Sequence, residues 1–166
     1  MLNKMKRYIW SHLNDLQVGK YAEYFVKMEL TMYGFEVYST EVDDRGIDFV
    51  ARRDGGPFIE VQVKSLRKFG YVYMQKSKFK LRENLYVAFG LFHDRKAPEL
   101  YLIPSRVWES PNALCVSRDY GGELMSAPEW GLNLSKKNMR LLKKFRFKTT
   151  VNKLCIPSSA STSQKP

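Results

Sequence analysis

Apolar residues recur at the spacing of an amphipathic helix between residues 15 and 33. The residues of this apolar stripe are Val18, Tyr21, Ala22, Phe25, Met28 and Met32. Such a stripe predicts a helix that packs one face on the core. Asn14 fits the N-cap position, with Gln17 three residues later as in a capping box, and Gly34 fits the C-terminal stop.

Short runs of β-forming residues follow this helix. The expected strands are 35–39, 47–52, 58–65, 71–74, 85–92 and 100–103, with a turn at 43–46. Residues 54–57, with the sequence DGGP, join the second and third strands and predict a β-hairpin. The run LYVAFGLF at 85–92 is almost continuously apolar, which is typical of a central strand covered on both faces. Trp108 and Trp130 are expected to cover the core.

The C-terminal part of the chain predicts one more helix, a basic one over 135–148, with Ser135 as its N-cap. Its inward-facing residues would be Met139, Leu142 and Phe145. Residues 156–166 have low complexity, which predicts a disordered tail. The length of 166 residues fits one domain, which we expect to occupy residues 1–155.

Charge is unevenly distributed along the chain. There are 28 Lys and Arg residues against 17 Asp and Glu, a formal net charge of +11. Two acid-free segments hold most of the excess: 61–82 has seven basic residues and 135–166 has nine. This distribution predicts a polyanionic partner, most often nucleic acid, whose phosphates these segments would contact.

Membrane and disulfide-bonded classes are not expected. No run approaches the roughly 20 apolar residues of a membrane-spanning helix, and the N-terminus lacks the apolar region of a signal peptide. The two cysteines lie 40 residues apart and form no CxxC motif. We therefore expect a cytoplasmic protein without a membrane partner.

Polar residues of the predicted hairpin are expected to share one face. Side chains alternate across a strand, so Glu60, Gln62 and Lys64 point the same way. If the turn centres near Gly55, facing residues have numbers that sum to 110, which places Asp48 opposite Gln62. A plain ion pair between Lys64 and Glu60 is the alternative interpretation, but an unpartnered acid in the apolar run IDFV would be costly.

This cluster suits metal-assisted hydrolysis of a phosphodiester. Mg²⁺ takes oxygen ligands, usually one or two carboxylates with waters and substrate phosphate. It polarises the phosphate and lowers the pKa of a bound water that becomes the nucleophile. A neighbouring lysine, here Lys64, orients that water and stabilises the charge that builds on the phosphate. We expect Mg²⁺ as the cofactor, with Mn²⁺ able to substitute.

A family resemblance extends over residues 14–105. The segments that carry it are GKYAEYFV in the first helix, RGIDFV, FIEVQVKS and YLIPS. Together they resemble the PD-(D/E)XK nuclease superfamily, the fold of many restriction enzymes and of archaeal Holliday junction resolvases. The resemblance implies an α/β fold with a restriction-endonuclease-like core, a mixed central sheet flanked by helices in the order αβββαβ. It also implies catalytic roles for Asp48, Gln62, Lys64 and, from the helix, Glu23.

One position departs from the family pattern. The carboxylate expected two residues before the lysine is Gln62 here, which resembles the QXK variant of Mrr-type restriction endonucleases. A glutamine oxygen can ligate Mg²⁺ but adds no charge, and Glu60 on the same face would restore that charge directly or through water. The metal ligands implied by the resemblance are Asp48, Gln62, Glu60 and the backbone carbonyl of Val63.

The resulting prediction is a Mg²⁺-dependent DNA endonuclease. The basic residues expected to hold the DNA backbone are Arg67, Lys68, Lys76, Lys78, Lys80, Lys136, Lys137, Arg140, Lys143 and Lys144. A homodimer is expected, because cutting both strands of a duplex favours two active sites.

Several alternatives stay open at this point. Gln62 favours a DNA-binding module that kept the nuclease fold, lost efficient catalysis and acts within a larger DNA-processing or defence system. An RNA-directed nuclease is a further alternative. Glu23 would either support catalysis or pair with Lys20 or Lys27 at helical spacing. The aromatic residues between 69 and 79 would either stack on bases or pack in the core.

Overall fold

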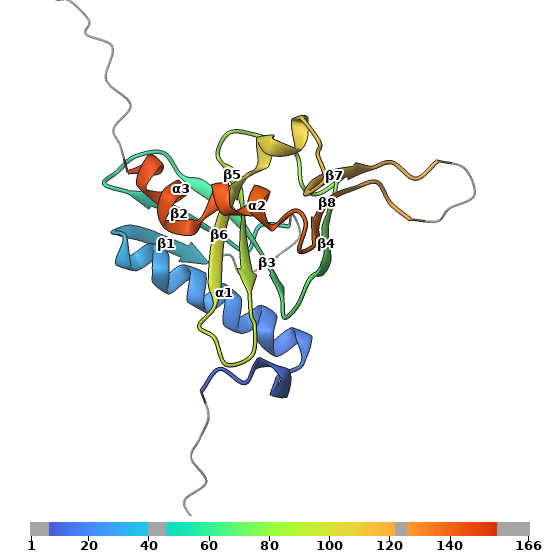
Figure 1. Ribbon diagram of the computed structural model, residues 1–166. Coiled ribbons are helices and arrows are strands. Elements are labelled where there is room, and N and C mark those ends of the chain that lie inside the picture. The colour runs from blue at the N-terminus through green and yellow to red at the C-terminus, as the bar shows by residue number, and fades with distance from the viewer. Residues whose placement is uncertain (1–6, 40–45, 122–125, 156–166) are drawn as a thin grey trace, which may run out of the picture.

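The computed structural model describes residues 7–39, 46–121 and 126–155 (Figure 1). A five-stranded sheet forms its centre, with two helices, 15–32 and 147–154, packed on one face and a three-stranded sheet on the other. Within the described ranges, no helix has the length and apolar character needed to cross a membrane. The predicted turn at 43–46, except for Gly46, and the predicted tail at 156–166 lie outside these ranges.

Helix α1 (Asp15–Met32) begins at the predicted capping box. The Gln17 N–H donates to Asn14 Oδ1 at 2.9 Å, and the Asn14 N–H donates to Gln17 Oε1 at 2.9 Å. Gly34 follows the helix with a φ of +83°, a left-handed conformation that glycine adopts without strain. Both predicted ends of the helix are therefore confirmed.

The buried face of α1 differs from the prediction. Its buried residues are Val18, Ala22, Val26 and Leu30. Met28 and Met32 are instead 61% and 82% exposed. Each lies two positions beyond a buried residue, which turns it roughly 200° around the helix. The prediction that these two methionines face the core was wrong.

The main sheet has the strand order β1-β2-β3-β5-β6. Its strands are β1 (Phe35–Ser39), β2 (Phe49–Arg53), β3 (Ile59–Leu66), β5 (Leu85–Leu91) and β6 (Glu99–Pro104). Neighbours are antiparallel except β3 and β5, which run parallel, so the sheet is mixed. The predicted fold class, a mixed sheet flanked by helices, is confirmed.

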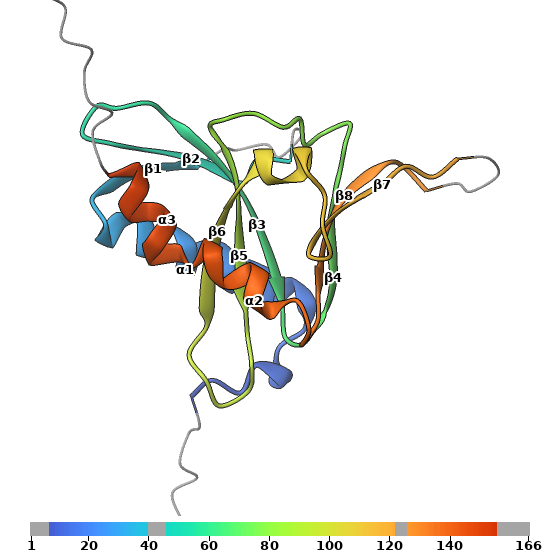
Figure 2. The same ribbon diagram turned by 45° about the horizontal axis from the view of Figure 1, so that its top comes forward.

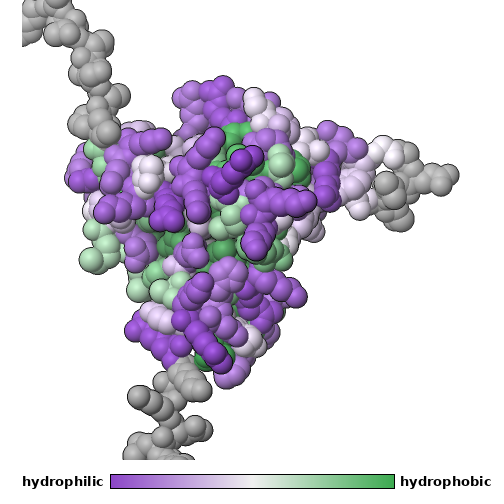
Figure 3. Space-filling view, viewed as in Figure 1, coloured by the Kyte–Doolittle hydropathy of each residue, from purple (hydrophilic) through white to green (hydrophobic). Residues whose placement is uncertain are grey.

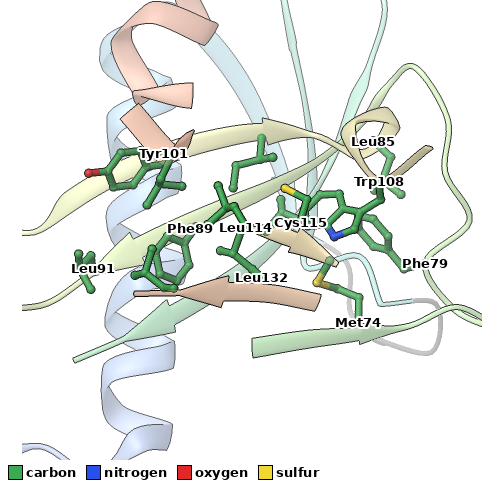
Figure 4. Packing of buried hydrophobic residues seen from close by; sticks show 14 residues of the cluster. Met74, Phe79, Leu85, Phe89, Leu91, Tyr101, Trp108, Leu114, Cys115 and Leu132 are labelled. Atoms are coloured by element: carbon green, nitrogen blue, oxygen red, sulfur yellow. The ribbon is translucent and has the colours of Figure 1, made fainter. Parts of the chain in front are cut away.

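Two hydrophobic clusters pack on opposite faces of this sheet. One joins the sheet to α1 and to α3 (Phe147–Leu154), and it includes Tyr86 and Ala88 of β5. The other contains Val87 and Phe89 of the same strand and lies against the second sheet (Figure 4). Every residue of β5 is buried, as predicted for a strand covered on both faces. Trp108 is fully buried in the second cluster, and Trp130 packs against it.

The second sheet has the strand order β4-β8-β7 and is antiparallel throughout. Its strands are β4 (Gly70–Gln75), β7 (Cys115–Arg118) and β8 (Glu129–Leu134). Met74, Cys115 and Leu132 project from it into the core. Figures 1 and 2 both show β7 and β8 reaching out from the rest of the molecule.

Strand β4 occupies a place where the αβββαβ order has a helix. The segment between β3 and β5 is described throughout, and it contains β4 followed by turns rather than a second helix. Its sequence GYVYMQ is rich in aromatic and β-branched residues, which favour a strand. The helices that flank the main sheet therefore come from the two ends of the chain.

The predicted C-terminal helix over 135–148 is wrong as a continuous element. The chain forms α2 (Met139–Leu142), a 3₁₀ turn η3 (Lys143–Phe145) and then α3. Arg146 interrupts the helix with extended angles, φ −48° and ψ 134°, and bridges Tyr101 at the edge of β6. Phe145 packs on one hydrophobic cluster and Phe147 belongs to the other, so the chain passes around the sheet edge here.

The N-cap of this region also differs from the prediction. Asn138, rather than Ser135, precedes the helical residues, and its Oδ1 accepts the Ser135 N–H at 2.8 Å. The predicted inward residues Met139, Leu142 and Phe145 do pack on the core. Their basic neighbours are exposed, and Figure 3 shows hydrophilic side chains over the face that α2 and α3 form. In Figure 2, α2, η3 and α3 follow one another, and α3 lies beside β6.

We expect Gly131→Ala to destabilise the protein by about 1–3 kcal/mol. A Cβ at Gly131 would lie 2.0 Å from Tyr71 Oη and 2.4 Å from two of its ring carbons. That ring cannot move freely, because its hydroxyl donates to Glu129 at 2.6 Å. Urea unfolding measures the change. Gly19→Ala is the matched control: nothing lies within 4 Å of its Cβ position, and the helix interior gains from alanine. Equal unfolding midpoints for Gly131→Ala and the parent would contradict this close packing.

Candidate active site

Asp48 is held against strand β3 by two hydrogen bonds. Its N–H donates to the Val61 carbonyl at 2.9 Å, and its Oδ2 accepts the Val63 N–H at 2.5 Å. Phe49, the next residue, pairs with Val61, so the predicted register of the hairpin is confirmed. The side chain of Asp48 thus has a fixed position beside the middle of β3.

Gln62 and Lys64 line a cleft of about 440 Å³ between β3 and β4. They share it because residues two apart on a strand face the same way. The other lining residues are Gly46, Tyr71, Val72, Tyr73, Met74, Gln75, Lys78 and Phe79. The cleft therefore lies on the face of the main sheet that looks toward the second sheet, beside β4, which is an edge strand of that second sheet.

The amide of Gln62 carries an unsatisfied acceptor. Its Oε1 is buried and accepts no hydrogen bond in the described part of the structure. Gly46, with a φ of +67°, lies close against the same amide: a Cβ there would be 3.2 Å from Nε2. A buried oxygen without a donor costs about 1–3 kcal/mol, and a bound cation would satisfy it.

Glu60 does not join Gln62 and Lys64 at the cleft. Arg82 donates to its Oε2 through Nε at 2.7 Å and also through Nη2. The Glu60 side chain is 24% exposed, so this ion pair is partly shielded from water. Glu60 lies at the start of β3, where its carboxylate is neutralised by Arg82.

Glu23 lies between two lysines on α1. Lys20 Nζ and Lys27 Nζ each contact one of its carboxylate oxygens at 2.7 Å. Burial alone raises the pKa of Glu23, but the hydrogen bonds and charges of both lysines outweigh it, and the net pKa is lowered. The hydrogen bond and charge of Glu23 raise the pKa of Lys20, with smaller contributions from Tyr24 and Asp48. The charge of Glu23 is therefore already paired on α1.

The oxygen donors present fit a magnesium ion that keeps most of its own waters. Among the described residues, no three His, Cys, Asp or Glu side chains gather into a metal site. Continued by one position, the register places Asp48 opposite Gln62, whose buried Oε1 accepts no hydrogen bond in the described part of the structure. Mg²⁺ is often bound through only one or two carboxylates, with waters and phosphate completing its shell. The N–H of Val63 is used by Asp48, and ligation by its carbonyl stays a prediction.

The basic residues assigned to DNA divide into two groups. Arg67 joins the end of β3 to the start of α1 by donating to the Leu13 carbonyl and to Asp15, each at 2.6 Å. Lys76 contacts Asp119 at 2.8 Å and lies 4.1 Å from the ring centroid of Trp130. The assigned residues that are exposed are Lys68, Lys78, Lys80, Lys136, Lys137, Arg140, Lys143 and Lys144. Of these, Lys78 lines the cleft.

Some features of the site were not predicted from the sequence. Gly46 was assigned only to a turn, and its packing on Gln62 has no sequence signal beyond its being the glycine of GID. Arg82, the partner of Glu60, is 22 residues away along the chain. Tyr71 and Tyr73 line the cleft, and their alternation along β4 was the available signal.

Comparison with solved structures identifies similar folds. The Holliday junction resolvase Hjc of Archaeoglobus fulgidus has a TM-score of 0.51 and 15% sequence identity, over 78% of this chain and 98% of the resolvase. A bacterial homing endonuclease gives a TM-score of 0.49 and 19% identity, over 82% of this chain and 91% of its own. No protein-family model and no curated protein sequence matches the chain. The likeness to the resolvase establishes the fold, a mixed α/β architecture shared with a nuclease.

Proposed function

We propose that this protein is a metal-dependent DNA endonuclease whose active site is the cleft at Gln62 and Lys64. The observation that carries the proposal is the combination of Asp48, fixed beside β3, with the orphaned oxygen of Gln62 and a lysine two residues later. These groups combine a hard-cation donor set with a positive charge for phosphate. The nuclease fold adds support.

The residues of the site have distinct proposed roles. Asp48 and Gln62 would hold Mg²⁺ or Mn²⁺, which would supply positive charge at the scissile phosphate. The Lys64 ammonium would donate to a phosphate oxygen, which would stabilise the growing negative charge and help to orient the attacking water beside that phosphate. The oxygen of the water would then bond to phosphorus while one ester P–O bond breaks, and the departing sugar oxygen would take up, through solvent, the proton that the water loses and leave as a hydroxyl. Glu23 would orient Lys20 near Asp48 and would have no direct contact with substrate.

The surrounding features are proposed to serve DNA binding and assembly. The exposed lysines and arginines of α2, of η3 and of the segment after β4 would track the phosphate backbone. A cytoplasmic homodimer, acting as a single-domain nuclease over residues 1–155, would bring two sites to the two strands of a duplex. The QXK pattern VQVK is proposed to mark an Mrr-like subtype.

A second candidate function is a DNA-binding module without efficient catalysis. The observation that favours it is Gln62, which leaves Asp48 as the single carboxylate proposed to hold the metal among the described residues. Metal binding separates the two candidates, because the module needs none.

Asp48→Asn and Lys64→Ala are each expected to reduce cleavage of plasmid DNA in Mg²⁺ or Mn²⁺ by at least about 100-fold. Asparagine keeps an oxygen for the Val63 N–H but removes the charge, so loss of folding is not expected. Initial rates of nicking and linearisation measure the effect.

The matched controls are Asp54→Asn and Lys96→Ala. Asp54 lies in the exposed hairpin turn, and Lys96 is exposed at the turn between β5 and β6. Both should cut at the parental rate. Cleavage that persists in Asp48→Asn and Lys64→Ala would place the active site elsewhere.

Gln62→Glu is expected to tighten Mg²⁺ and Mn²⁺ binding about tenfold, because it adds a second carboxylate beside Asp48. Without metal the new buried charge should lower the melting temperature, and saturating Mn²⁺ should restore it. Titration calorimetry and thermal melts provide the readouts. Asn152→Asp adds the same charge at an exposed position of α3 and should change neither metal binding nor the melting temperature. Tight DNA binding with no heat of metal binding to the parent or to Gln62→Glu would support the module instead.

Replacing Lys143 and Lys144 together by alanine is expected to weaken DNA binding similarly for all sequences. The slope of log affinity against log salt should fall by about 0.9 for each phosphate that these lysines neutralise in the parent. Fluorescence anisotropy at several salt concentrations measures this slope. Lys96→Ala is the control, and an unchanged slope in the double variant would remove α2 and η3 from the DNA-binding surface.

A further inference from the structure

The outer face of β4 carries two stacked aromatic rings beside the cleft. Tyr71 and Tyr73 alternate with Val72 and Met74, which pack toward the core. The two tyrosine rings have centroids 6.5 Å apart and an interplanar angle of 21°. Both residues line the cleft that holds Gln62 and Lys64.

Tyr71 is a fixed support for this pair. Its hydroxyl donates to the buried carboxylate of Glu129 at 2.6 Å, and its ring covers Gly131. The guanidinium of Arg118 lies 4.3 Å from the ring centroid. Burial is the main cause that raises the pKa of Tyr71, with Glu129 adding to it, so the phenol stays protonated as a donor. Tyr71 therefore belongs to the framework of the second sheet.

Tyr73 has a different environment. Its side chain is 50% exposed, and its hydroxyl makes no hydrogen bond within the described part of the chain. The Tyr73 ring lies beside the fixed ring of Tyr71, with 21° between the two ring planes. It has the geometry of a stacking surface for a flat ligand.

The charges around the cleft indicate which class of ligand would bind there. Lys64 and the exposed Lys78 line the same cleft as Tyr73, and no acidic residue is among its described lining residues. An aromatic surface beside a positively charged groove is the arrangement that binds single-stranded nucleic acid, in which bases stack on rings and phosphates contact cations. A base inside a duplex already stacks on its neighbours, so only an unpaired base is free to occupy Tyr73.

We infer that Tyr73, supported by Tyr71, stacks on an unpaired base next to the phosphate held at Lys64. The substrate class is therefore DNA with unpaired nucleotides at the cleavage point, such as a flap, a gap or a frayed end. This inference rests on the proposed function and gives that site its substrate preference.

Binding experiments with Asp48→Asn protein in EDTA test the inference without cleavage. Two DNAs are compared, a fully paired duplex and the same duplex with a short unpaired flap that carries 2-aminopurine. Tyr73→Ala should weaken flap binding about tenfold, leave duplex binding unchanged and abolish the quenching of 2-aminopurine. Tyr73→Trp should restore both flap affinity and quenching, because it restores an aromatic ring.

Tyr38→Ala is the matched control, since Tyr38 is a 43% exposed tyrosine on β1. It should bind both DNAs like the Asp48→Asn parent. Thermal melts of each variant verify folding, and Tyr73→Trp covers the case in which alanine disturbs the sheet.

Equal weakening for paired and flap DNA, or unchanged flap binding in Tyr73→Ala, would overturn the inference. The proposed function fails by a different result, the absence of cleavage and of metal binding in the protein with Asp48 intact. If the protein cuts DNA and Tyr73→Ala changes flap and duplex binding equally, or changes neither, the proposed function stands and this substrate preference is rejected.

Discussion

The position of the candidate site depends on strand β3, because its alternate residues face the hydrophobic core on one side and the cleft on the other. Val61 packs in the cluster beneath α1 and α3, while Gln62 and Lys64 face the cleft. A slip of one residue would exchange these sets and place a lysine in the core. Antiparallel pairing to β2 and parallel pairing to β5 hold the strand on both sides. The position of Asp48 follows, since it bonds to the backbone of this strand.

The neutralised acids around β3 limit how strongly the site can bind a metal by itself. Glu23 is paired with two lysines and Glu60 with Arg82, so neither contributes a free negative charge. Divalent-cation affinity depends on the number of charged ligands. With Gln62 neutral, we expect the phosphate of bound DNA to supply part of the charge that holds the ion. Metal binding and DNA binding would then be linked, and the net charge of +11 would favour the DNA step.

Local patterns predicted the elements whose residues interact with their own neighbours in the sequence. The capping box at Asn14 and the register of the DGGP hairpin depend on residues a few positions apart, and both were predicted correctly. The break at Arg146 was not, because it arises where the chain rounds the edge of β6 to join two cores. The pairing of Glu60 with Arg82 likewise depends on where a distant turn lies. Apolar spacing identified α1, but only packing on the sheet selects Val26 over Met28 for its buried face.

The edge position of β4 connects the chemistry of the cleft with its recognition. Alternation around residues 71–74 indicated a strand, but its place beside Gln62 depends on pairing with β8, more than fifty residues later. Among the described strands β4 has a neighbour on one side only, and the residues of β4 line the cleft, so backbone N–H and C=O groups without a strand partner in the described part of the chain lie at its border. Phosphate oxygens readily accept hydrogen bonds from backbone N–H groups, and Lys64 and Lys78 add positive charge at the same cleft. A strand of DNA laid along β4 would meet donors for its backbone and the ring of Tyr73 for a base. A paired duplex would offer only its backbone, so under the proposed function this edge would favour a single strand over a double one.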